Sequence, residues 1–307
     1  ETHGAYQARH RGRRQVNIIV FAKTVRFLQA QTGSDPRQNN IAPGDLVDML
    51  NPFDEAALEV ALRIKDAAPE AEITVVSLGG PSAQAGLRRC LAMGADRASH
   101  ILYGDYVELD SWASAAILAA QARRMRYDLI LCGRQAIDSN AGLVGPYLAA
   151  QLAIPHISRI IKLAEPGSDG KITAERRLDR GDRETVECTA PALLTVERDI
   201  NVARIPTLPA MLAAAKLPIE NCSTEDLETA PTLNRTKTIR LSNPKAKRRA
   251  GKQLNPALSA AERMKLMMKG GGAPAPAKTA ALLEGCGEDV LEEFERLLIS
   301  SGVHFRP

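Results

Sequence analysis

The amino-acid sequence predicts a doubly wound α/β fold, in which helices cover both faces of a mostly parallel sheet. Short continuous apolar runs, typical of strands buried on both faces, alternate four times with segments of helical periodicity. Strands joined by helical crossovers lie parallel in one sheet, and ligands of such sheets bind beyond the carboxyl ends of the strands. A later group of short alternating runs predicts a small antiparallel addition, followed by a C-terminal arm.

The first strand is predicted from the apolar run VNIIVFAK at 16–23. About 27 residues without a clear pattern follow, and a loop of that length in a compact domain is usually functional or mobile. A helix is predicted at 51–70, where Asn51 suits the N-cap and Pro52 the first helical position. Asp54 places negative charge at the positive end of this helix.

Three further strand and helix pairs complete the alternation. The predicted strands are EITVVSLGG at 72–80, ASHILYG at 98–104 and YDLILCG at 127–133. The predicted helices lie at 82–96, where Gly94 marks the stop, at 111–126, and from Asn140 or Gly142 onward.

The pattern changes after Pro155. Strands are predicted at 156–163, 171–178, 183–188 and 191–200, the first three forming the antiparallel addition. Regularity fades from about Pro218: 234–252 carries eight Lys and Arg without Asp or Glu, 270–276 is linker-like, and 288–302 is an amphipathic helix. We therefore predict a flexible tail at 1–15, an α/β domain at 16–217 and a C-terminal arm at 218–307.

Composition excludes several classes of protein. The net charge is only +4 and aromatic content is 4%, which argues against nucleic-acid binding. No apolar run reaches the roughly 18–20 residues that span a membrane. The five cysteines form no CxxC or CxxH pair, so we expect small core residues in a reduced, intracellular compartment.

The turn between the strand at 127–133 and the following helix is unusually polar. Gly133 and Gly142 would let an anion approach the backbone, and a helix start supplies N–H groups without partners. A loop that ends a parallel strand and opens a helix is therefore suited to hold a phosphate. The polar side chains that could bond a ribose or a base are Gln135, Asp138, Ser139 and Asn140, although the pattern also fits a capped turn that binds nothing.

Other motifs predict no catalytic centre and no metal site. The GxGxxG, GxxxxGK[ST] and GxSxG motifs are absent. His100 and His156 lie far apart, and a metal site needs more ligands at suitable spacing. The chain is thus not expected to be an enzyme in its own right.

Several stretches together resemble the β subunit of electron transfer flavoprotein, the group that includes the FixA proteins. They fall in one order over about 16–219 and read AKTV, NPFDEAALEVALRIK, LAMGADRA, GRQAID and APALLTVERDINVARIPTLPAML. This resemblance implies an adenine-nucleotide-binding, Rossmann-like domain. It also implies a heterodimer with an α subunit that holds the redox FAD, while the β subunit holds AMP or, in electron-bifurcating members, a second FAD.

The function implied is electron transfer from flavoprotein dehydrogenases to a quinone-linked or other acceptor, with the chemistry done by flavin. Such a carrier is expected in a bacterial cytoplasm, or in the mitochondrial matrix if the chain is eukaryotic. A stand-alone adenine-nucleotide-binding regulator with the same fold is the alternative, and it would remain a monomer beside a co-expressed α subunit.

The resemblance also implies which residues touch the nucleotide. They are Phe21, Lys23, Asn51, Pro52, Phe53, Asp54, Leu78, Gly133, Arg134, Gln135, Ala136, Ile137, Asp138, Ser139, Asn140, Ala141, Gly142, Leu143 and Val144. Phe53 is also expected to face the α-subunit flavin. Leu208 corresponds to the exposed leucine that docks on partner dehydrogenases, and the C-terminal arm is expected to contact the α subunit.

The chain departs from the family pattern at four places. Arg134 replaces a lysine, and Ser139 and Asn140 replace acidic residues, which puts the contacts to the nucleotide in doubt. Lys216 alone remains of the lysines that often follow the docking leucine, so partner choice is expected to differ. The divergent segment 26–50 is where a second FAD could be accommodated, and the tail after 270 is longer than typical.

Overall fold

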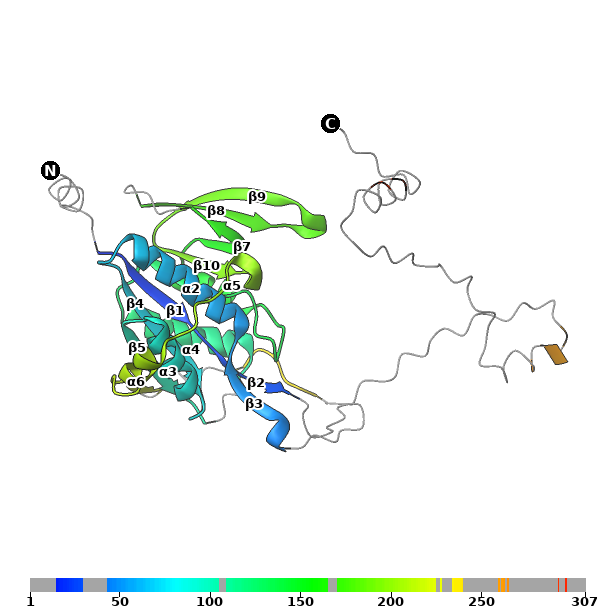
Figure 1. Ribbon diagram of the computed structural model, residues 1–307, viewed down its shortest axis with the longest axis horizontal. Coiled ribbons are helices and arrows are strands. Elements are labelled where there is room, and N and C mark those ends of the chain that lie inside the picture. Colours follow the sequence, from blue (N-terminus) through cyan, green and yellow to red (C-terminus); the bar gives the residue numbers. More distant parts are fainter. Residues whose placement is uncertain are drawn as a thin grey trace. The chain divides into compact units, whose positions relative to one another are not determined.

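The computed structural model describes residues 15–29, 43–104, 109–164, 170–224 and 234–239, and the single positions 227, 259, 261, 262, 264, 292 and 296. The chain divides into a unit at 1–243 and a unit at 244–307, and almost all described residues belong to the first (Figure 1). The predicted linker at 270–276 and nearly all of the predicted tail and final helix lie outside the described residues.

The described part of the first unit is built on a nine-stranded sheet in the order β11-β5-β4-β1-β6-β10-β7-β8-β9. The strands from β11 to β7 in this order pair in parallel, and β8 and β9 pair antiparallel. Their bounds are β1 Asn17–Phe21, β4 Glu72–Gly79, β5 Arg97–Leu102, β6 Leu129–Gly133, β7 His156–Leu163, β8 Lys171–Arg177, β9 Arg183–Thr189, β10 Ala192–Val196 and β11 Glu220–Ser223. The predicted fold class is confirmed.

Helices cover both faces of the sheet (Figure 1). They are α2 Pro52–Ala67, α3 Ala83–Met93, α4 Ser111–Arg123, α5 Val144–Leu152 and α6 Leu208–Ala214. Alternate residues of β1 point to opposite faces, so Ile18 packs with α2 and α3, whereas Ile19 packs with α4 and α5. Within the described residues, no helix combines the length and apolarity needed to cross a membrane.

The strand order reverses at β1. The chain runs from β1 outward through β4 to β5, then returns to the other side of β1 as β6. Phe21 at the end of β1 is in register with Val76 of β4 and with Cys132 of β6. The carboxyl ends of β1 and β6 are therefore neighbours at the switch point, where ligands of open α/β sheets bind.

The segment predicted as one long loop after β1 contains a hairpin, so that prediction was wrong in part. Strands β2 Thr24–Leu28 and β3 Leu46–Leu50 pair antiparallel over five residue pairs. Val25 and Leu50 are buried while Phe27 is half exposed. Hydrophobic residues alternate only over a short stretch, and their side chains lie on both sides of the hairpin. A sequence pattern with one apolar face is therefore absent, and the strands were not predicted.

Three other elements differ from prediction. The helix expected from Asn140 or Gly142 begins at Val144, because Asn140 and Gly142 have φ of 51° and 63°, outside the helical region. Strand β11 and the seven-residue helix α6 were not predicted. Short 3-10 turns also occur at Pro43–Asp45, Asp179–Gly181 and Arg198–Ile200.

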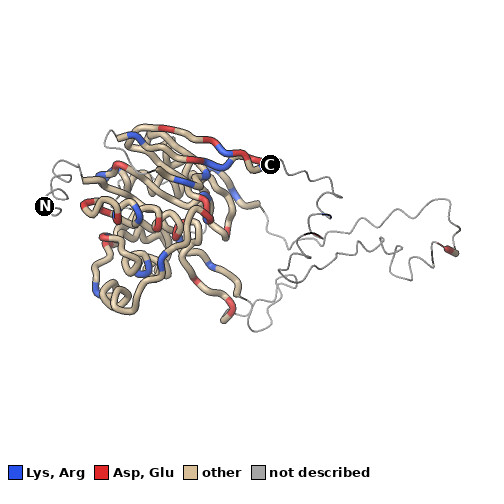
Figure 2. Tube along the Cα trace, turned by 45° about the horizontal axis from the view of Figure 1, so that its top comes forward, with Lys and Arg blue, Asp and Glu red and all other residues tan. Residues whose placement is uncertain are grey.

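The antiparallel addition is confirmed as β7, β8 and β9. Acidic and basic residues mix along its hairpin (Figure 2). Three ion pairs cross from β8 to β9: Lys171–Glu187 at 2.8 Å, Arg176–Glu184 at 2.6 Å and Arg183–Glu175 at 3.0 Å. Exposed pairs contribute at most about 1 kcal/mol each, so they favour the register of the two strands more than overall stability.

Candidate functional site

A buried carboxylate joins the ends of the two strands at the switch point. Asp54, in the first turn of α2, accepts a hydrogen bond from the backbone N–H of Lys23 at 2.9 Å and another from that of Gly133 at 2.8 Å. Lys23 follows β1 and Gly133 ends β6. One side chain therefore ties both strand ends to the start of α2.

Asn51 joins the same helix start to the loop after β6. It stands at the N-cap position of α2, as predicted, but its side chain makes no capping hydrogen bond. Its Nδ2 instead donates to the carbonyl of Gln135 at 3.0 Å, and its Oδ1 accepts from the N–H of Ile137 at 3.3 Å. Asn51 thus fixes the course of the loop between β6 and α5.

Polar contacts continue along this loop. Lys23 Nζ lies 2.7 Å from the carboxylate of Asp138, and Gln135 Nε2 donates to Asn140 Oδ1 at 3.0 Å. The Arg134 guanidinium lies over the Phe53 ring, 5.7 Å from its centroid, within the range of a cation–π contact. The loop is therefore held to α2 and β1 over most of its length.

The structure places the predicted nucleotide residues at this edge, although Phe21 is buried, and it places the predicted docking residue Leu208 elsewhere. The exposed residues of the loop between β6 and α5 include Ser139, Asn140 and Ala141. Leu78 is half-buried near the end of β4. Phe21 is only 5% exposed, because its ring packs in the core with α4 and α5. Leu208 is separate, since it begins α6, which packs against α3.

This edge can hold an anion. The first N–H groups of α5 have no acceptor within the helix, and they carry the positive end of its dipole. Gly145 sits in that first turn, where a Cβ would lie 2.5 Å from Thr195 Cγ2, so the helix start is pressed against β10. Lys23 adds a cation at the neighbouring strand end. The described residues hold no group of three or more His, Cys, Asp or Glu suited to a metal ion.

Sequence reasoning missed two charged residues at the edge. Glu197 follows β10 and is 6% exposed; it lies 3.5 Å from Arg134 Nε and 3.4 Å from Arg159 Nε. Arg159 has φ of 59°, an uncommon conformation for a residue with a side chain. Glu197 could have been found, because an acidic residue directly after the apolar run PALLTV stands at the carboxyl end of a strand.

A cavity of about 730 Å³ lies at the opposite, amino-terminal edge of the sheet, with Asn17, Thr74, Arg97 and Gln121 in its lining. Arg97 already pairs with the carboxylates of Glu72, at 3.8 Å, and Glu220. Arg124 and Arg126 also line this cavity, but it lies away from the carboxyl ends of the strands, where ligands of open α/β sheets bind. We therefore retain the carboxyl edge as the candidate site.

Comparison with known proteins points to one family. Residues 40–227 match the model of the electron transfer flavoprotein domain. The chain is 34% identical over 214 residues to the electron transfer flavoprotein subunit beta of Thermoanaerobacterium thermosaccharolyticum, an alignment that covers 69% of this chain and 80% of the relative. It is 39% identical over 181 residues to the subunit of that name in Bacillus subtilis, covering 59% and 69%.

A third relative is named as a subunit of a larger complex. The caffeyl-CoA reductase–Etf complex subunit CarD of Acetobacterium woodii is 34% identical over 240 residues, covering 76% of this chain and 89% of the relative. The family model spans every candidate residue of the edge except Phe21 and Lys23.

The close approach at Gly133 leads to a first prediction. A Cβ at this position would lie 2.5 Å from both Asp54 Oδ1 and Phe53 Cβ, so Gly133→Ala must push the loop away from α2. We expect the free energy of unfolding, measured in urea, to fall by about 1–3 kcal/mol. The matched control is Gly79→Ala at the end of β4, where the new Cβ would make an ordinary 3.4 Å contact with Ala83. Equal losses in both variants would contradict the proposed crowding.

The burial of Asp54 leads to a second prediction. Burial disfavours the charged carboxylate and outweighs the hydrogen bonds from Lys23, Asn51 and Gly133, which raises the pKa of Asp54 from 3.8 to about 6. Between pH 4 and 6 the folded chain therefore keeps a proton that the unfolded chain releases. The contribution of Asp54 to the free energy of unfolding should fall by about 3 kcal/mol as pH rises through this window.

Urea unfolding of wild type and Asp54→Asn across pH 4–7 tests this, because the other titrating groups cancel in the difference. The wild-type stability relative to the variant should decrease from pH 4 through 6 and level off near pH 7. Asp48→Asn serves as the control: the hydrogen bond from Arg26 lowers the pKa of Asp48, so the stability of the wild type relative to this variant should stay level from pH 5 to 7. A pH-independent difference for Asp54→Asn would refute the assignment.

Proposed function

The chain belongs to the family of electron transfer flavoprotein β subunits, and from that premise we propose that it forms a heterodimeric electron carrier with an α subunit. In this carrier the α subunit holds the redox FAD, and this chain holds an adenine nucleotide, either AMP or a second FAD. Electrons pass from flavoprotein dehydrogenases to a quinone-linked or other acceptor.

The observation that carries the nucleotide site is the joining of β1, β6 and α2 by Asp54. It leaves the loop 133–144 presented at the switch point of the sheet, in front of the start of α5. In the proposed complex, the first N–H groups of α5 and Lys23 hold the phosphate. Ser139 and Asn140 bond the ribose or the base, and Leu78 and Val144 supply apolar contact to the adenine.

The replacement of acidic residues by Ser139 and Asn140 favours this arrangement, because two fewer negative charges face the phosphate. The flavin supplies the redox chemistry when it is bound. The residues of this chain bind, orient and exclude water, and Phe53, with Arg134 over its ring, faces the α-subunit flavin. No catalytic side chain of this subunit is required.

An exposed apolar surface supports docking to a partner. We define the docking segment as residues 201–212, which includes α6 up to its fifth residue. Leu208 is 68% exposed, Met211 49% and Leu212 60%. Because one relative is named as part of a complex with caffeyl-CoA reductase, we propose that this segment contacts flavoprotein dehydrogenases or reductases of the acyl-CoA type.

The nucleotide assignment predicts a measurable content. When the chain is co-purified with its α subunit and denatured by heat, mass spectrometry should find one adenine nucleotide per heterodimer beyond the α-subunit FAD. Gly133→Ala should retain markedly less of this nucleotide, and Gly79→Ala should retain it at the wild-type level. A heterodimer with one FAD and no second nucleotide would refute the site.

The docking assignment predicts a kinetic effect. Leu208→Ala should raise the KM for an acyl-CoA dehydrogenase that reduces the wild-type heterodimer by about tenfold, as expected for a central apolar contact, with kcat unchanged. Leu102→Ala, which truncates another leucine that is 47% exposed, is the matched control and should leave KM unchanged. The assignment fails if both variants behave as wild type.

A further inference from the structure

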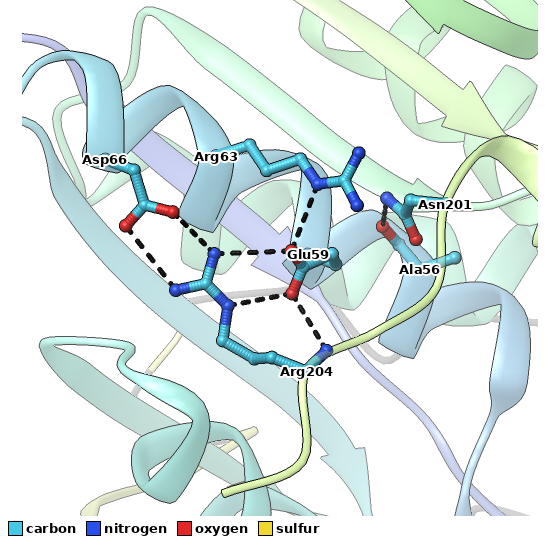
Figure 3. Close-up of polar contacts among 6 residues, drawn as sticks. All are labelled: Ala56, Glu59, Arg63, Asp66, Asn201 and Arg204. Atoms are coloured by element: carbon cyan, nitrogen blue, oxygen red, sulfur yellow. Dashed lines mark hydrogen bonds and ion pairs between the residues drawn. The ribbon is translucent and has the colours of Figure 1, made fainter.

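A buried glutamate on α2 holds the docking segment through one arginine. Glu59 is 4% exposed, and its Oε2 accepts hydrogen bonds from the backbone N–H of Arg204 at 3.1 Å and from its Nε at 2.9 Å (Figure 3). The Nη2 of Arg204 also donates to Glu59 Oε1 at 3.3 Å and to Asp66 Oδ2 at 2.6 Å. A single arginine therefore fixes both backbone and side chain of the segment to α2.

Neighbouring contacts hold the start of the segment in an extended course. Asn201 Nδ2 donates to the carbonyl of Ala56 at 3.0 Å, and Ala203 packs against the core cluster beneath α2. Two residues next to these contacts are instead exposed: Val202 to 86%, and Ile205, which follows Arg204, to 84%. Burial cannot account for the placement of two such exposed β-branched side chains, whereas the polar contacts of Asn201 and Arg204 can.

A second arginine holds the chain just beyond the far end of the segment. Arg88 of α3 donates through Nη1 to the carbonyl of Ala214 at 2.8 Å and to that of Leu217. Thr207 accepts a hydrogen bond from the N–H of Ala210 at 3.4 Å and so caps α6. Because both ends are fixed to neighbouring helices, the exposed apolar side chains between them keep a defined spacing.

We propose that Arg204 and Glu59 are positioning residues for partner docking, which present Val202, Ile205 and Leu208 as one preformed apolar surface to the dehydrogenase. This inference rests on the proposed docking function. Its physical basis is pre-organisation: a segment ordered in the free protein loses less conformational entropy when the partner binds. Without the pair, the same side chains would have to be ordered during each encounter.

The chemistry of the pair suits this role better than an ordinary surface ion pair. Burial acts to raise the pKa of Glu59, but the hydrogen bonds from Arg204 and Arg63 together outweigh it and hold the pKa below its usual value. The guanidinium reaches Glu59 and Asp66 at once through its planar array of donors, which an ammonium cannot reproduce. Arg204→Lys should therefore lose part of the effect, and Arg204→Gln more.

The experiment compares Arg204→Lys, Arg204→Gln and wild type in the complete heterodimer. With an acyl-CoA dehydrogenase that reduces the wild type, we expect Arg204→Gln to raise KM five- to tenfold and Arg204→Lys to raise it less. The value of kcat and the flavin content should not change. Hydrogen exchange of the amides at 201–207 should accelerate in the same order, while exchange in α3 stays at its wild-type rate.

Arg63→Gln is the matched control. Arg63 donates to the same Glu59 at 3.1 Å but does not touch the docking segment, so its loss should leave KM and exchange at 201–207 unchanged. If Arg204→Gln fails to assemble, Asp66→Asn removes only the outer contact of Arg204, and a two- to threefold rise in KM is expected. An unchanged KM in Asp66→Asn would then overturn the proposal.

The failures of the two proposals are distinguishable. If Leu208→Ala raises KM and the Arg204 variants do not, docking stands and the positioning role is overturned. Faster exchange at 201–207 with unchanged KM in Arg204→Gln would show a purely structural contact and would also overturn it. If Leu208→Ala leaves KM unchanged while Arg204→Gln raises it, the positioning role stands and the docking leucine is wrongly assigned.

Discussion

The geometry of the candidate site depends on the two hydrogen bonds that Asp54 accepts from the N–H groups of Lys23 and Gly133. Parallel strands leave their last backbone groups without partners at the edge of a sheet, and a buried donor without a partner costs about 1–3 kcal/mol. One carboxylate satisfies both strand ends and at the same time fixes the first turn of α2. The close approach that this requires explains why position 133 has no room for a Cβ.

Charge is distributed unequally over the carboxyl edge. Asp54 is buried and its charge is compensated by N–H groups, Asp138 is paired with Lys23, and Glu197 lies between Arg134 and Arg159. The acidic groups of the edge are thus engaged with the protein, whereas the start of α5 has no side-chain cap at Leu143. The cavity at the amino-terminal edge is lined by Arg97, Arg124 and Arg126, but it lies away from the switch point of the sheet. The topology of the sheet is therefore a better guide to the candidate site here than the presence of a cavity.

The parallel core was predictable because its strands are continuous apolar runs such as Leu129–Cys132, separated by helices with clear start signals such as Pro52. The edge of the sheet at which the site lies followed from the same reasoning. Two elements that are stabilised by contacts distant in sequence were not predicted. Strand β11 has only four residues, and the β2–β3 hairpin has no single apolar face that a sequence pattern could show. Asparagine is a residue type that favours the N-cap position. The side chain of Asn51 instead forms hydrogen bonds with Gln135 and Ile137 of the loop. The importance of Arg204 likewise depends on a partner 145 positions away in the sequence, which no local pattern reveals.

Helix α2 contributes to both regions that define the proposed carrier. Its first turn bears Asp54 at the proposed nucleotide edge, and later turns bear the buried Glu59 and the exposed Asp66, which both bind Arg204 of the docking segment. With a rise of about 1.5 Å per residue, Asp54 and Glu59 are separated by only about 7–8 Å along the axis of one continuous helix. Such a short stretch of helix is nearly incompressible, so any displacement of its first turn reaches Glu59 almost undiminished. If nucleotide binding at the first turn displaced α2, it would change affinity at the docking segment, and partner binding would change nucleotide affinity by the same factor.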